Sequence, residues 1–385
     1  MKSNDITRSG VYVKQPGGFK AFIPKPLPPE PAIHYDDELM SVLSQADHAL
    51  GRLDGTAETL PDLDLFVLMY KRKEAVLSSQ IEGTQATLAD LLRYEAEGKE
   101  HINSSDVREI VNYVNGMNYG LERLKTLPLS LRLMRDIHSR LLEGVRGSDR
   151  NPGEFRKSQV WIGTPGCTLA NAKFVPPPVP EMMTALGDFE EFLHSSEPMP
   201  MLIKVGLAHG QLETIHPFLD GNGRIGRLLV TFLLCEKGIL HRPLLYLSYY
   251  FKLHTAEYYD RLQAVRDTGD WEGWLKFFLR GVYDTAQEAT FTARRIVALR
   301  EELRRLRLTP KGHELLERLY ERPVVTVQTL EELGFPRSTA HNLLDELVEQ
   351  KVLREITGRQ RNRVYWFDHY LKLFGDLLTP GLDAP

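Results

Sequence analysis

The sequence predicts a mainly α-helical fold with one small β-hairpin and a C-terminal winged-helix domain. Apolar residues recur at helical spacing over most of the chain, as in Leu39, Leu43 and Ala46. A glycine- and proline-rich stretch at residues 144–178 interrupts this pattern and contains a short β-prone run. Residues after 309 follow a different order of helix, helix-turn-helix and two short strands, which is typical of a winged helix.

Length and composition are those of an ordinary globular protein. The chain has 385 residues, 42% hydrophobic and 26% charged, and a formal net charge of −4. The length suggests about two or three domains. The charge argues against a globally basic nucleic-acid binder but leaves room for a local basic patch. Cys167 and Cys235 are too few for a metal quartet or a disulfide framework.

The N-terminus and the apolar runs predict the compartment. The first residues are polar and lack the apolar core of a secretory signal. No apolar run approaches the roughly 20 residues that a spanning helix needs. A cytoplasmic protein without a membrane partner is therefore expected.

The elements of the first 308 residues follow from proline content and apolar spacing. Residues 1–35 are expected to form an extended arm along the protein surface, because five prolines lie between residues 24 and 31. The apolar spacing after this arm predicts helices from Asp36 onward and over Leu63–Tyr70, Lys71–Ser79, Val107–Leu124, Leu131–Leu142, Glu181–Leu193, Leu202–Leu212, Arg224–Glu236, Ala256–Val265, Glu272–Ala286 and Ala289–Arg307.

Three domains are expected from these changes in texture. Residues 1–125 would hold the proline-rich arm and the first helices, and residues 126–308 the main helical core. Residues 309–385 would hold the winged helix and a tail. Within the core, Val160, Trp161 and Ile162 form the β-prone run, Gly163 to Gly166 a turn and Lys173 to Val175 a return strand.

The winged helix is expected to contain three helices and two strands. The helices are predicted over Lys311–Glu321, Val327–Leu333 and Ser338–Gln350, and the strands over Val352–Ile356 and Arg363–Phe367. Residues 310–370 carry nine basic and ten acidic side chains. Phosphate contacts dominate affinity for DNA, so this balance favours a protein-interaction or dimerisation role over DNA binding, which stays possible.

The segment from His216 to Arg227 is the densest chemical signal in the sequence. It reads His-Pro-Phe-Leu-Asp-Gly-Asn-Gly-Arg-Ile-Gly-Arg and connects one predicted helix to the next. Gly221 and Gly223 let the backbone turn tightly and expose successive N–H groups at a helix start, which attracts phosphate. Asp220 supplies a hard oxygen ligand for Mg²⁺, the usual companion of nucleotide phosphates.

Cations and a base complete this segment. Arg224 and Arg227 are three residues apart, so they share a helix face and can clamp two phosphates. His216 can accept a proton near neutral pH. Alone, a histidine before proline is more often structural, and paired arginines usually form a solvated face. Together, these residues predict a site for nucleotidyl or phosphoryl transfer.

The segment resembles the Fic family signature, His-Pro-Phe-x-[Asp/Glu]-Gly-Asn-Gly-Arg-x-x-Arg, at every specified position. Residues 152–156, 160–163 and 174–178 are similar to the flap hairpin of that family, and the proline-rich arm resembles its N-terminal region. The overall order resembles bacterial Fic adenylyltransferases with a C-terminal winged helix. The resemblance implies a Fic-type (Fido) catalytic core and a protein adenylyltransferase that moves AMP from ATP, with Mg²⁺, to a Ser, Thr or Tyr hydroxyl of a protein, including itself.

The resemblance also implies a role for each matched position. His216 would deprotonate the target hydroxyl, and Asp220 would hold Mg²⁺ on the phosphates. A phosphorylating relative carries Lys at the position of Gly223, so AMP transfer is favoured here. The other matched positions would bind the phosphates of ATP: Gly221, Asn222 and Gly223 as an anion hole, Arg224 at the β-phosphate and Arg227 at the γ-phosphate. Tyr250 would contact the adenine base. Core packing is the first interpretation of the tyrosines around Tyr250.

A second, shorter motif lies upstream. Ser78, Glu82 and Gly83 match the family's inhibitory pattern, [Ser/Thr]-x-x-x-Glu-[Gly/Asn]. Alone, this would be a solvated glutamate at a helix end. Beside the signature, the resemblance implies that Glu82 reaches the ATP site, pairs with Arg227 and takes the place of the γ-phosphate, which would make the enzyme autoinhibited. In some relatives the same glutamate assists removal of AMP.

Partners and alternatives complete the hypothesis. A flap hairpin at residues 160–163 can dock an extended peptide by backbone pairing, which would bring a protein hydroxyl to His216. A homodimer is expected. The alternatives are a Fic enzyme that mainly removes AMP, transfer of another nucleotide such as UMP, and a winged-helix DNA-binding regulator.

Overall fold

The fold is that of a computed structural model, which describes residues 7–58, 63–97, 105–164 and 166–375. Residue 165 of the predicted flap turn and residues 376–385, at the end of the predicted winged-helix domain and tail, lie outside these residues. Within the described ranges, no helix has both the length and the apolar character that crossing a bilayer requires.

The chain forms two compact units, each assembled from two stretches of sequence. The first unit comprises Met1–Arg52 and Asn112–Gln287, and the second comprises Leu53–Val111 and Glu288–Pro385. The sequence boundaries of the units fall within three helices: α1 (Asp37–Glu58), α4 (Ser105–Leu124) and α11 (Trp271–Leu303). The three predicted domains, with boundaries near residues 125 and 308, stay a prediction.

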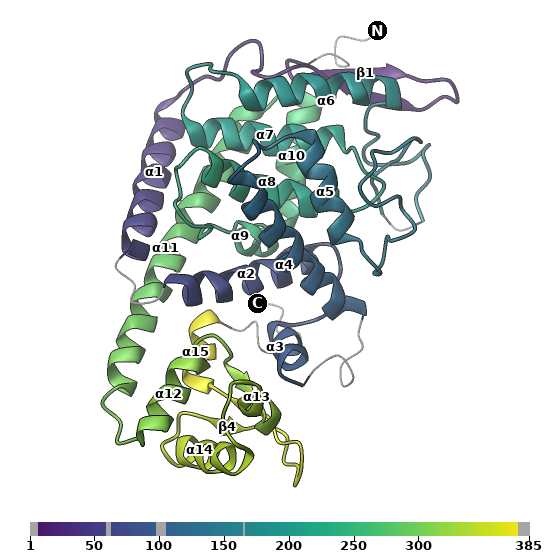
Figure 1. Cartoon of the computed structure of the whole chain (residues 1–385). Coiled ribbons are helices and arrows are strands. Elements are labelled where there is room, and N and C mark those ends of the chain that lie inside the picture. The colour runs from purple at the N-terminus through teal and green to yellow at the C-terminus, as the bar shows by residue number, and fades with distance from the viewer. Residues whose placement is uncertain (1–6, 59–62, 98–104, 165, 376–385) are drawn as a thin grey trace. The chain divides into compact units, whose positions relative to one another are not determined.

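The first unit is built around two helices that pack along each other, α7 (Met201–Ile215) and α8 (Asn222–Glu236) (Figure 1). Almost every side chain of α7 is buried, because this helix is apolar on all sides. The helices predicted at 202–212 and 224–236 are thereby confirmed. The unit also contains α5 (Leu131–Leu141), α6 (Val179–His194), α9 (Ser248–Leu253) and α10 (Thr255–Thr268), of which α9 was not predicted.

A β-hairpin occupies the predicted N-terminal arm. Strands β1 (Gly10–Lys14) and β2 (Lys20–Pro24) pair antiparallel. Gly17 and Gly18 have φ angles of 100° and 90°, which the turn between the strands requires. The extended backbone agrees with the prediction, but the surface location is wrong for Phe22, which is fully buried and donates its N–H to the Val175 carbonyl (2.9 Å).

Two helix boundaries also differ from the prediction. The two helices expected at 272–286 and 289–307 form the single helix α11, because neither glycine nor proline breaks the pattern at residues 287 and 288. Likewise, the segments predicted at 63–70 and 71–79 form one helix, α2 (Leu63–Ile81). The next helix, α3 (Leu88–Glu97), was not predicted.

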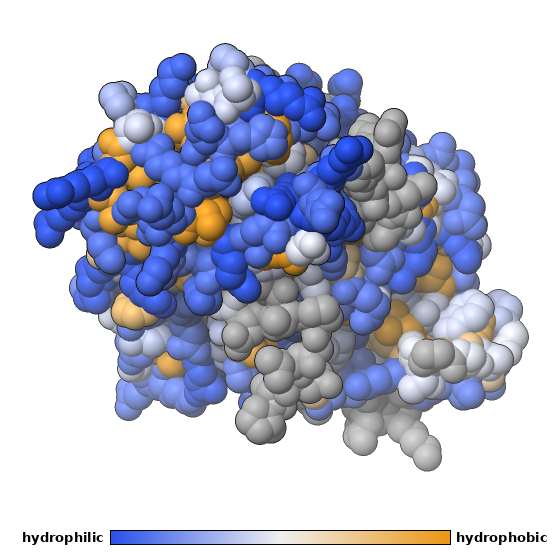
Figure 2. Space-filling view, turned by 90° about the horizontal axis from the view of Figure 1, so that it is seen from below, coloured by the Kyte–Doolittle hydropathy of each residue, from blue (hydrophilic) through white to orange (hydrophobic). Residues whose placement is uncertain are grey.

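The C-terminal part of the second unit has the predicted order of elements. It contains α12 (Pro310–Leu319), β3 (Val324–Val325), α13 (Val327–Glu332), α14 (Arg337–Glu349), β4 (Arg354–Glu355), β5 (Tyr365–Trp366), α15 (Asp368–Leu371) and a 3₁₀ turn at Lys372–Phe374. The strands form an antiparallel sheet in the order β3-β5-β4, in which the two-residue strand β3 was not predicted. Hydrophilic residues dominate the face of the molecule shown in Figure 2, with smaller hydrophobic patches between them.

Candidate active site

The predicted catalytic segment begins where α7 ends in a left-handed residue. His216 has φ 50° and ψ 62°, and its N–H donates to the Leu212 carbonyl (2.9 Å), which closes the helix. A left-handed conformation costs a residue other than glycine about 1–2 kcal/mol. The surrounding contacts must therefore hold His216 in place.

Arg156 supplies that support from a fully buried position. Its backbone N–H donates to the Pro217 carbonyl and its Nε to the His216 carbonyl, both at 2.9 Å. The two terminal nitrogens donate to the carbonyls of Pro177 (2.5 Å) and Ser158 (3.2 Å). Burial lowers the pKa of Arg156 to about 10, so it stays charged at neutral pH. One guanidinium thus joins the loop that begins at His216 to the two sides of the flap.

The loop itself is closed by an amide and a stacked ring. The Asn222 side chain accepts the N–H of Phe218 and donates to the carbonyl of Phe218, both at 2.8 Å. The buried ring of Phe218 stacks on His138 of α5 at 3.8 Å between centroids and an interplanar angle of 11°. Asn222 therefore fixes the curvature of the loop, and the stacking of His138 on Phe218 fixes the distance of the loop from α5.

His138 also fixes the peptide of Asp220. Its Nδ1 accepts the N–H of Gly153 (2.9 Å), so Nε2 carries the proton and donates to the Asp220 carbonyl (2.9 Å). Burial, the largest cause, lowers the pKa of His138 to about 4, so the ring is neutral at pH 7. A neutral ring with one donor and one acceptor matches these two partners.

The start of α8 combines a carboxylate, a left-handed glycine and buried cations. Asp220 lies half-buried, and its Oδ1 is 3.1 Å from Nη2 of Arg224. Gly221 caps α8 with φ 79°. Arg224 and Arg227 are 1% and 3% exposed, so the cations predicted to clamp phosphates lie in the protein interior rather than on a solvated face.

Close packing of α7 on α8 depends on Gly226. A Cβ at this position would lie 2.3 Å from Oε1 of Glu213. The Gly226 carbonyl contacts Nδ1 of His209 at 2.8 Å, and Nε2 of His209 contacts the Tyr258 hydroxyl at 2.9 Å. His209 thus connects α7 to α8 and α10.

The donor set fits Mg²⁺ together with a nucleotide. In the part of the chain that the structure describes, no group of three or more His, Cys, Asp or Glu is arranged to hold a metal by itself. Asp220 offers a carboxylate whose side chain is 35% exposed. A single carboxylate suits Mg²⁺, which commonly takes its other ligands from water and substrate phosphates.

The predicted flap forms with a single backbone bridge. Ile162 and Phe174 exchange two N–H to carbonyl hydrogen bonds of 2.8 and 3.0 Å. Trp161 is 43% exposed beside this bridge, and its indole N–H donates to the Cys167 carbonyl (3.1 Å). A Cβ on Gly163 would lie 2.6 Å from the Cys167 sulfur, so a larger residue would not fit in this turn.

Arg266 of α10 contacts the flap through the ring of Phe174. Its guanidinium lies over the Phe174 ring at 3.8 Å. It also donates to the Thr214 hydroxyl and the Glu213 carbonyl, both at 3.2 Å, at the end of α7. The flap and the residues just before His216 therefore share one buried cation.

Tyr250, the predicted adenine contact, lies in an aromatic cluster. Its ring centroid is 4.5 Å from that of His254 and 5.1 Å from that of Phe277. Gly281 of α11 leaves room for this ring, because a Cβ there would lie 2.6 Å from it. These contacts are the core packing that the sequence favoured, and a nucleotide contact at Tyr250 stays a prediction.

The predicted inhibitory motif lies at the end of α2, in the second unit. Ser78 is fully buried, Glu82 is half-buried, and Gly83 is exposed with φ 96°. The N–H groups of Glu82 and Gly83 donate to the carbonyls of Ser79 and Gln80, which ends the helix. Arg227 belongs to the first unit. The pairing of Glu82 with Arg227 therefore stays a prediction.

Sequence reasoning proposed the contiguous part of the candidate site and missed the residues that support it. The structure brings His216, Asp220, Asn222 and Arg224 together on one loop and the first turn of α8. Arg156 was noticed in the flap motif without a role. His138 and Arg266 were missed, because no sequence pattern links them to a loop about 80 residues downstream or 50 upstream; only the tertiary fold does.

Two family models match this chain. One, described as Fic/DOC family N-terminal, matches residues 40–122, and one described as Fic/DOC family matches residues 128–234. The chain therefore contains Fic/DOC family domains. The first match begins after the proline-rich arm, so the N-terminal region of the family corresponds to the helices from α1 to α4 rather than to that arm.

The chain is also similar to curated proteins and to solved structures. It is 30% identical over 253 residues to "Protein adenylyltransferase Fic" of Aedes aegypti, covering 61% of this chain and 46% of that protein. It is 30% identical over 251 residues to the protein of the same name from Culex quinquefasciatus (61% and 45%). The chain spans about half the length of these curated relatives.

Two solved structures share the fold. A Fic family protein from Desulfovibrio desulfuricans G20 aligns with a TM-score of 0.57 and 19% identity, over 87% of this chain and 97% of that one. Fic-1 (residues 134–508) from C. elegans aligns with a TM-score of 0.51 and 20% identity, over 68% and 74%. These likenesses confirm the predicted Fic-type helical core.

Proposed function

We propose that this chain is a protein adenylyltransferase that transfers AMP from ATP to a Ser, Thr or Tyr hydroxyl of a protein, including itself. The observation that carries this proposal is the complete signature from His216 to Arg227, which forms a loop and the first turns of α8. The names of the curated relatives and the Fic/DOC family domains support the same activity.

In the proposed reaction, His216 is the base. It takes the proton of the target hydroxyl while the oxygen attacks the α-phosphorus of ATP. The bond from the α-phosphorus to the bridging oxygen breaks, AMP stays on the target and pyrophosphate leaves. Arg156 holds the left-handed backbone of His216, which supports the positioned base that this step requires.

The phosphates are bound by the start of α8. Gly221, Asn222 and Gly223 present backbone N–H groups at a helix N-terminus, which favours anions. Arg224 and Arg227 would hold the β- and γ-phosphates. Because both guanidiniums are buried, their attraction to a polyanion is screened less than on a surface. Preorganised donors of this kind stabilise charge in phosphoryl and nucleotidyl transfer.

Asp220 would hold the Mg²⁺ that accompanies ATP. When bound, the ion would neutralise phosphate charge and orient the leaving pyrophosphate. The ion pair of Asp220 with Arg224 keeps the carboxylate at the mouth of the loop, and a Cβ on Gly147 would lie 2.9 Å from its Oδ2. Gly147 therefore leaves the room that this carboxylate needs.

The test is to incubate the protein with Mg²⁺ and each labelled nucleoside triphosphate in turn, and to measure the intact mass of the product. The expected result is addition of AMP from ATP. His216→Ala should transfer at below about 1% of the wild-type rate, because a general base contributes about 10²–10⁴-fold. ATP affinity, measured by calorimetry, should stay within about threefold, since the base does not hold the phosphates.

A matched control is His194→Ala, which removes an exposed histidine at the end of α6 in the same unit. It should transfer AMP at the wild-type rate. Transfer by His216→Ala at more than a few per cent of wild type would overturn the assignment of the base. Addition of UMP in preference to AMP would overturn the assignment of the donor.

A further inference from the structure

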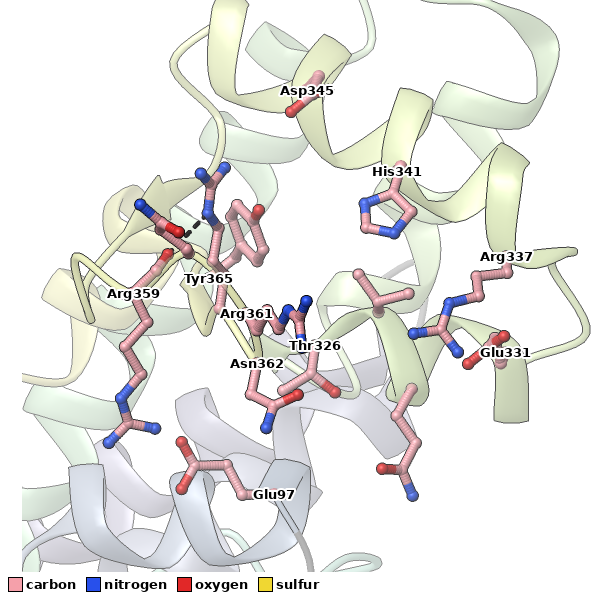
Figure 3. Close-up of a pocket in the computed structure, with 14 residues that line it drawn as sticks. Glu97, Thr326, Glu331, Arg337, His341, Asp345, Arg359, Arg361, Asn362 and Tyr365 are labelled. Carbon is pink, nitrogen blue, oxygen red and sulfur yellow. Dashed lines mark hydrogen bonds between the residues drawn. The ribbon is translucent and has the colours of Figure 1, made fainter.

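A groove in the winged helix carries a set of arginines that the proposed reaction does not use. Its cavity volume is about 630 Å³, and it lies between α14, the start of α13 and the wing, defined here as residues 356–364 between β4 and β5. We call it the arginine groove. Its charged lining includes Arg337, His341 and Asp345 of α14 and Arg359, Arg361 and Arg363 of the wing (Figure 3).

Three of these arginines are available to an external anion. In the described part of the chain, Arg337, Arg359 and Arg361 have no carboxylate within ion-pair distance. The Nε of Arg363 donates to the Arg359 carbonyl (2.9 Å), which braces the wing and leaves the other nitrogens of Arg363 available. Glu97 at the end of α3 also lines the groove, but it is 5% exposed and pairs with Arg93 at 3.6 Å.

Half of the ten acidic residues between positions 310 and 370 are engaged away from the groove: Glu317, Glu332, Glu346, Glu355 and Asp368. Glu346 accepts the N–H and the hydroxyl of Thr309 at the start of α12. Glu355 accepts N–H groups of residues 357 and 358 inside the wing, and Asp368 pairs with Arg354 at 2.7 Å. The groove itself is lined by four arginines and by three carboxylates, those of Glu97, Glu331 and Asp345, so the nearly neutral total of residues 310–370 includes a small local excess of positive charge.

The groove has the geometry of a helix-turn-helix. The connection from α13 to α14 turns at Gly334, whose φ is 94°. Arg337, His341 and Asp345 are four residues apart, so they form one face of α14, and Ser338 and Asn342 beside them are exposed. Such a face can enter the major groove of DNA while the flanking wing meets the phosphates.

We propose that the arginine groove binds the phosphate backbone of duplex DNA and presents the first turns of α14 to the bases. A protein partner is less well matched, because such interfaces centre on apolar or aromatic anchors. In residues 309–375, all of which the structure describes, the one well-exposed large apolar side chain is Val348 (37%), which does not line the groove. This binding is separate from the adenylyl transfer proposed above.

The test is fluorescence anisotropy with the full chain and a labelled mixed-sequence duplex of about 21 base pairs, two turns of DNA. Affinity should fall as salt rises from about 50 to 200 mM, with a slope of log K against log salt of about −3 to −4. The triple variant Arg337→Gln/Arg359→Gln/Arg361→Gln should make this slope about 2.7 shallower, because each lost phosphate contact removes about 0.9.

A matched control removes the same charge outside the groove. Arg305, Arg307 and Arg318 are exposed residues of the same unit that do not line it, and their triple change to Gln should leave the slope unchanged within about 1. The melting temperature and the rate of self-adenylylation should match wild type in both triple variants. Equal loss of affinity in the two variants would overturn the proposal.

A gain-of-binding pair keeps the proposal testable even if the groove variant folds poorly. Asp345→Asn removes a carboxylate that faces the groove and should tighten binding about three- to tenfold. Glu349→Gln, on the exposed end of the same helix, should change it by less than about twofold. No binding at about 50 mM salt would overturn the proposal. So would displacement of the duplex by polyglutamate or by inorganic polyphosphate at equal charge concentration, which would indicate an acidic protein or a small polyanion as the ligand.

Discussion

Among the described residues, Arg156 is a buried cation that contacts carbonyl oxygens rather than a carboxylate. It donates to three carbonyl groups and is 1% exposed, so each hydrogen bond replaces water that the site excludes. The carbonyls belong to His216 in the loop and to Pro177 and Ser158 in the flap. The side chain therefore couples the position of the proposed base to the surface where a target peptide would dock.

The first prediction concerns the replacement of Arg156. Arg156→Met should lower the free energy of unfolding by on the order of 3 kcal/mol, because hydrogen bonds from a charged donor contribute about 1.5–3 kcal/mol each and the carbonyls lose their partner. In the folded protein, kcat for self-adenylylation should fall about 100-fold, since misplacing a catalytic group by about 1 Å costs that much. The Kd for ATP should change by less than about threefold.

Arg156→Lys provides the conservative comparison. Lysine keeps the charge but cannot donate to several carbonyls at once as the guanidinium does. Compared with Arg156→Met, Arg156→Lys should therefore regain part of the free energy of unfolding and little of kcat. If the folded fraction of Arg156→Met transfers AMP at the wild-type rate, Arg156 serves stability alone. The measurements are chemical denaturation, initial rates and calorimetry on the same preparations.

The second prediction concerns pH and the buried His138. Its pKa is lowered by burial from 6.5 to about 4, and that of the fully buried His209 is lowered to about 4 for the same reason. Between about pH 4 and 6.5 the unfolded chain therefore binds more protons than the folded one, and stability falls as pH falls. Each histidine contributes on the order of 3 kcal/mol that is fully present above pH 6.5 and lost by about pH 4.

His138→Gln isolates one of these contributions. Glutamine can accept from Gly153 and donate to Asp220 without titrating. The slope of unfolding free energy against pH should therefore correspond to about one proton taken up on unfolding, that of His209, instead of about two. Stability at pH 7 should drop by about 1 kcal/mol through the lost stacking on Phe218. Urea denaturation at a series of pH values measures both. An unchanged slope would show that His138 is protonated in the folded protein.

At the scale of elements, the spacing of apolar residues predicted the helices well. The proline content of residues 1–35 predicted an extended arm but not the hairpin within it. The helices α5 to α8 lie close to their predicted ranges, because α5, α6 and α8 have a periodic apolar face and the uniformly apolar α7 has clear ends. The β1–β2 hairpin was not predicted, because the prolines between residues 24 and 31 indicated an extended arm. Pro16, Gly17 and Gly18 between two β-prone runs are the turn signal that would have found it.

The third prediction concerns the C-terminal end of α2. Gly83 has φ 96° and nothing within 4 Å of where a Cβ would lie, so a side chain there is strained but does not clash. Gly83→Ala should destabilise the protein by about 1–2 kcal/mol. Gly83→Asn should cost less, because asparagine tolerates the left-handed region. This explains physically why the inhibitory pattern accepts either glycine or asparagine at this position. Thermal denaturation of the two variants checks it, and equal losses of stability would contradict the explanation.

At the scale of the whole molecule, the candidate site divides into a predictable and an unpredictable part. Residues 216–227 are contiguous, so their spacing alone places a base, a carboxylate, an anion-binding turn and two cations at one helix start. The supports come from distant segments: Arg156, His138 and Arg266 reach the loop only through the tertiary fold. Total charge likewise predicted a nearly neutral winged helix, but ion pairing determines which of its charges remain available.

Regulation also belongs to this scale, because its two predicted partners lie in different units. Glu82 directly follows α2 in the second unit, and Arg227 lies on α8 in the first. The resemblance to the family implies that the Glu82 carboxylate takes the place of the γ-phosphate beside Arg227. An arginine and a carboxylate form strong paired hydrogen bonds, so ATP would bind without its last cation and with its α-phosphorus out of line for attack.

The fourth prediction follows from this competition. Glu82→Gly should raise the rate of self-adenylylation about tenfold or more, a barrier change of only about 1.4 kcal/mol. Arg227→Ala should not reproduce the gain, because it removes the cation for the γ-phosphate together with the partner of Glu82. The double variant should therefore behave as Arg227→Ala alone. Initial rates of labelled AMP incorporation for the four proteins at one ATP concentration form a complete cycle. Equal rates for wild type and Glu82→Gly would make Glu82 an ordinary helix-end carboxylate, whereas full activation of the double variant would show that Glu82 inhibits through a group other than Arg227.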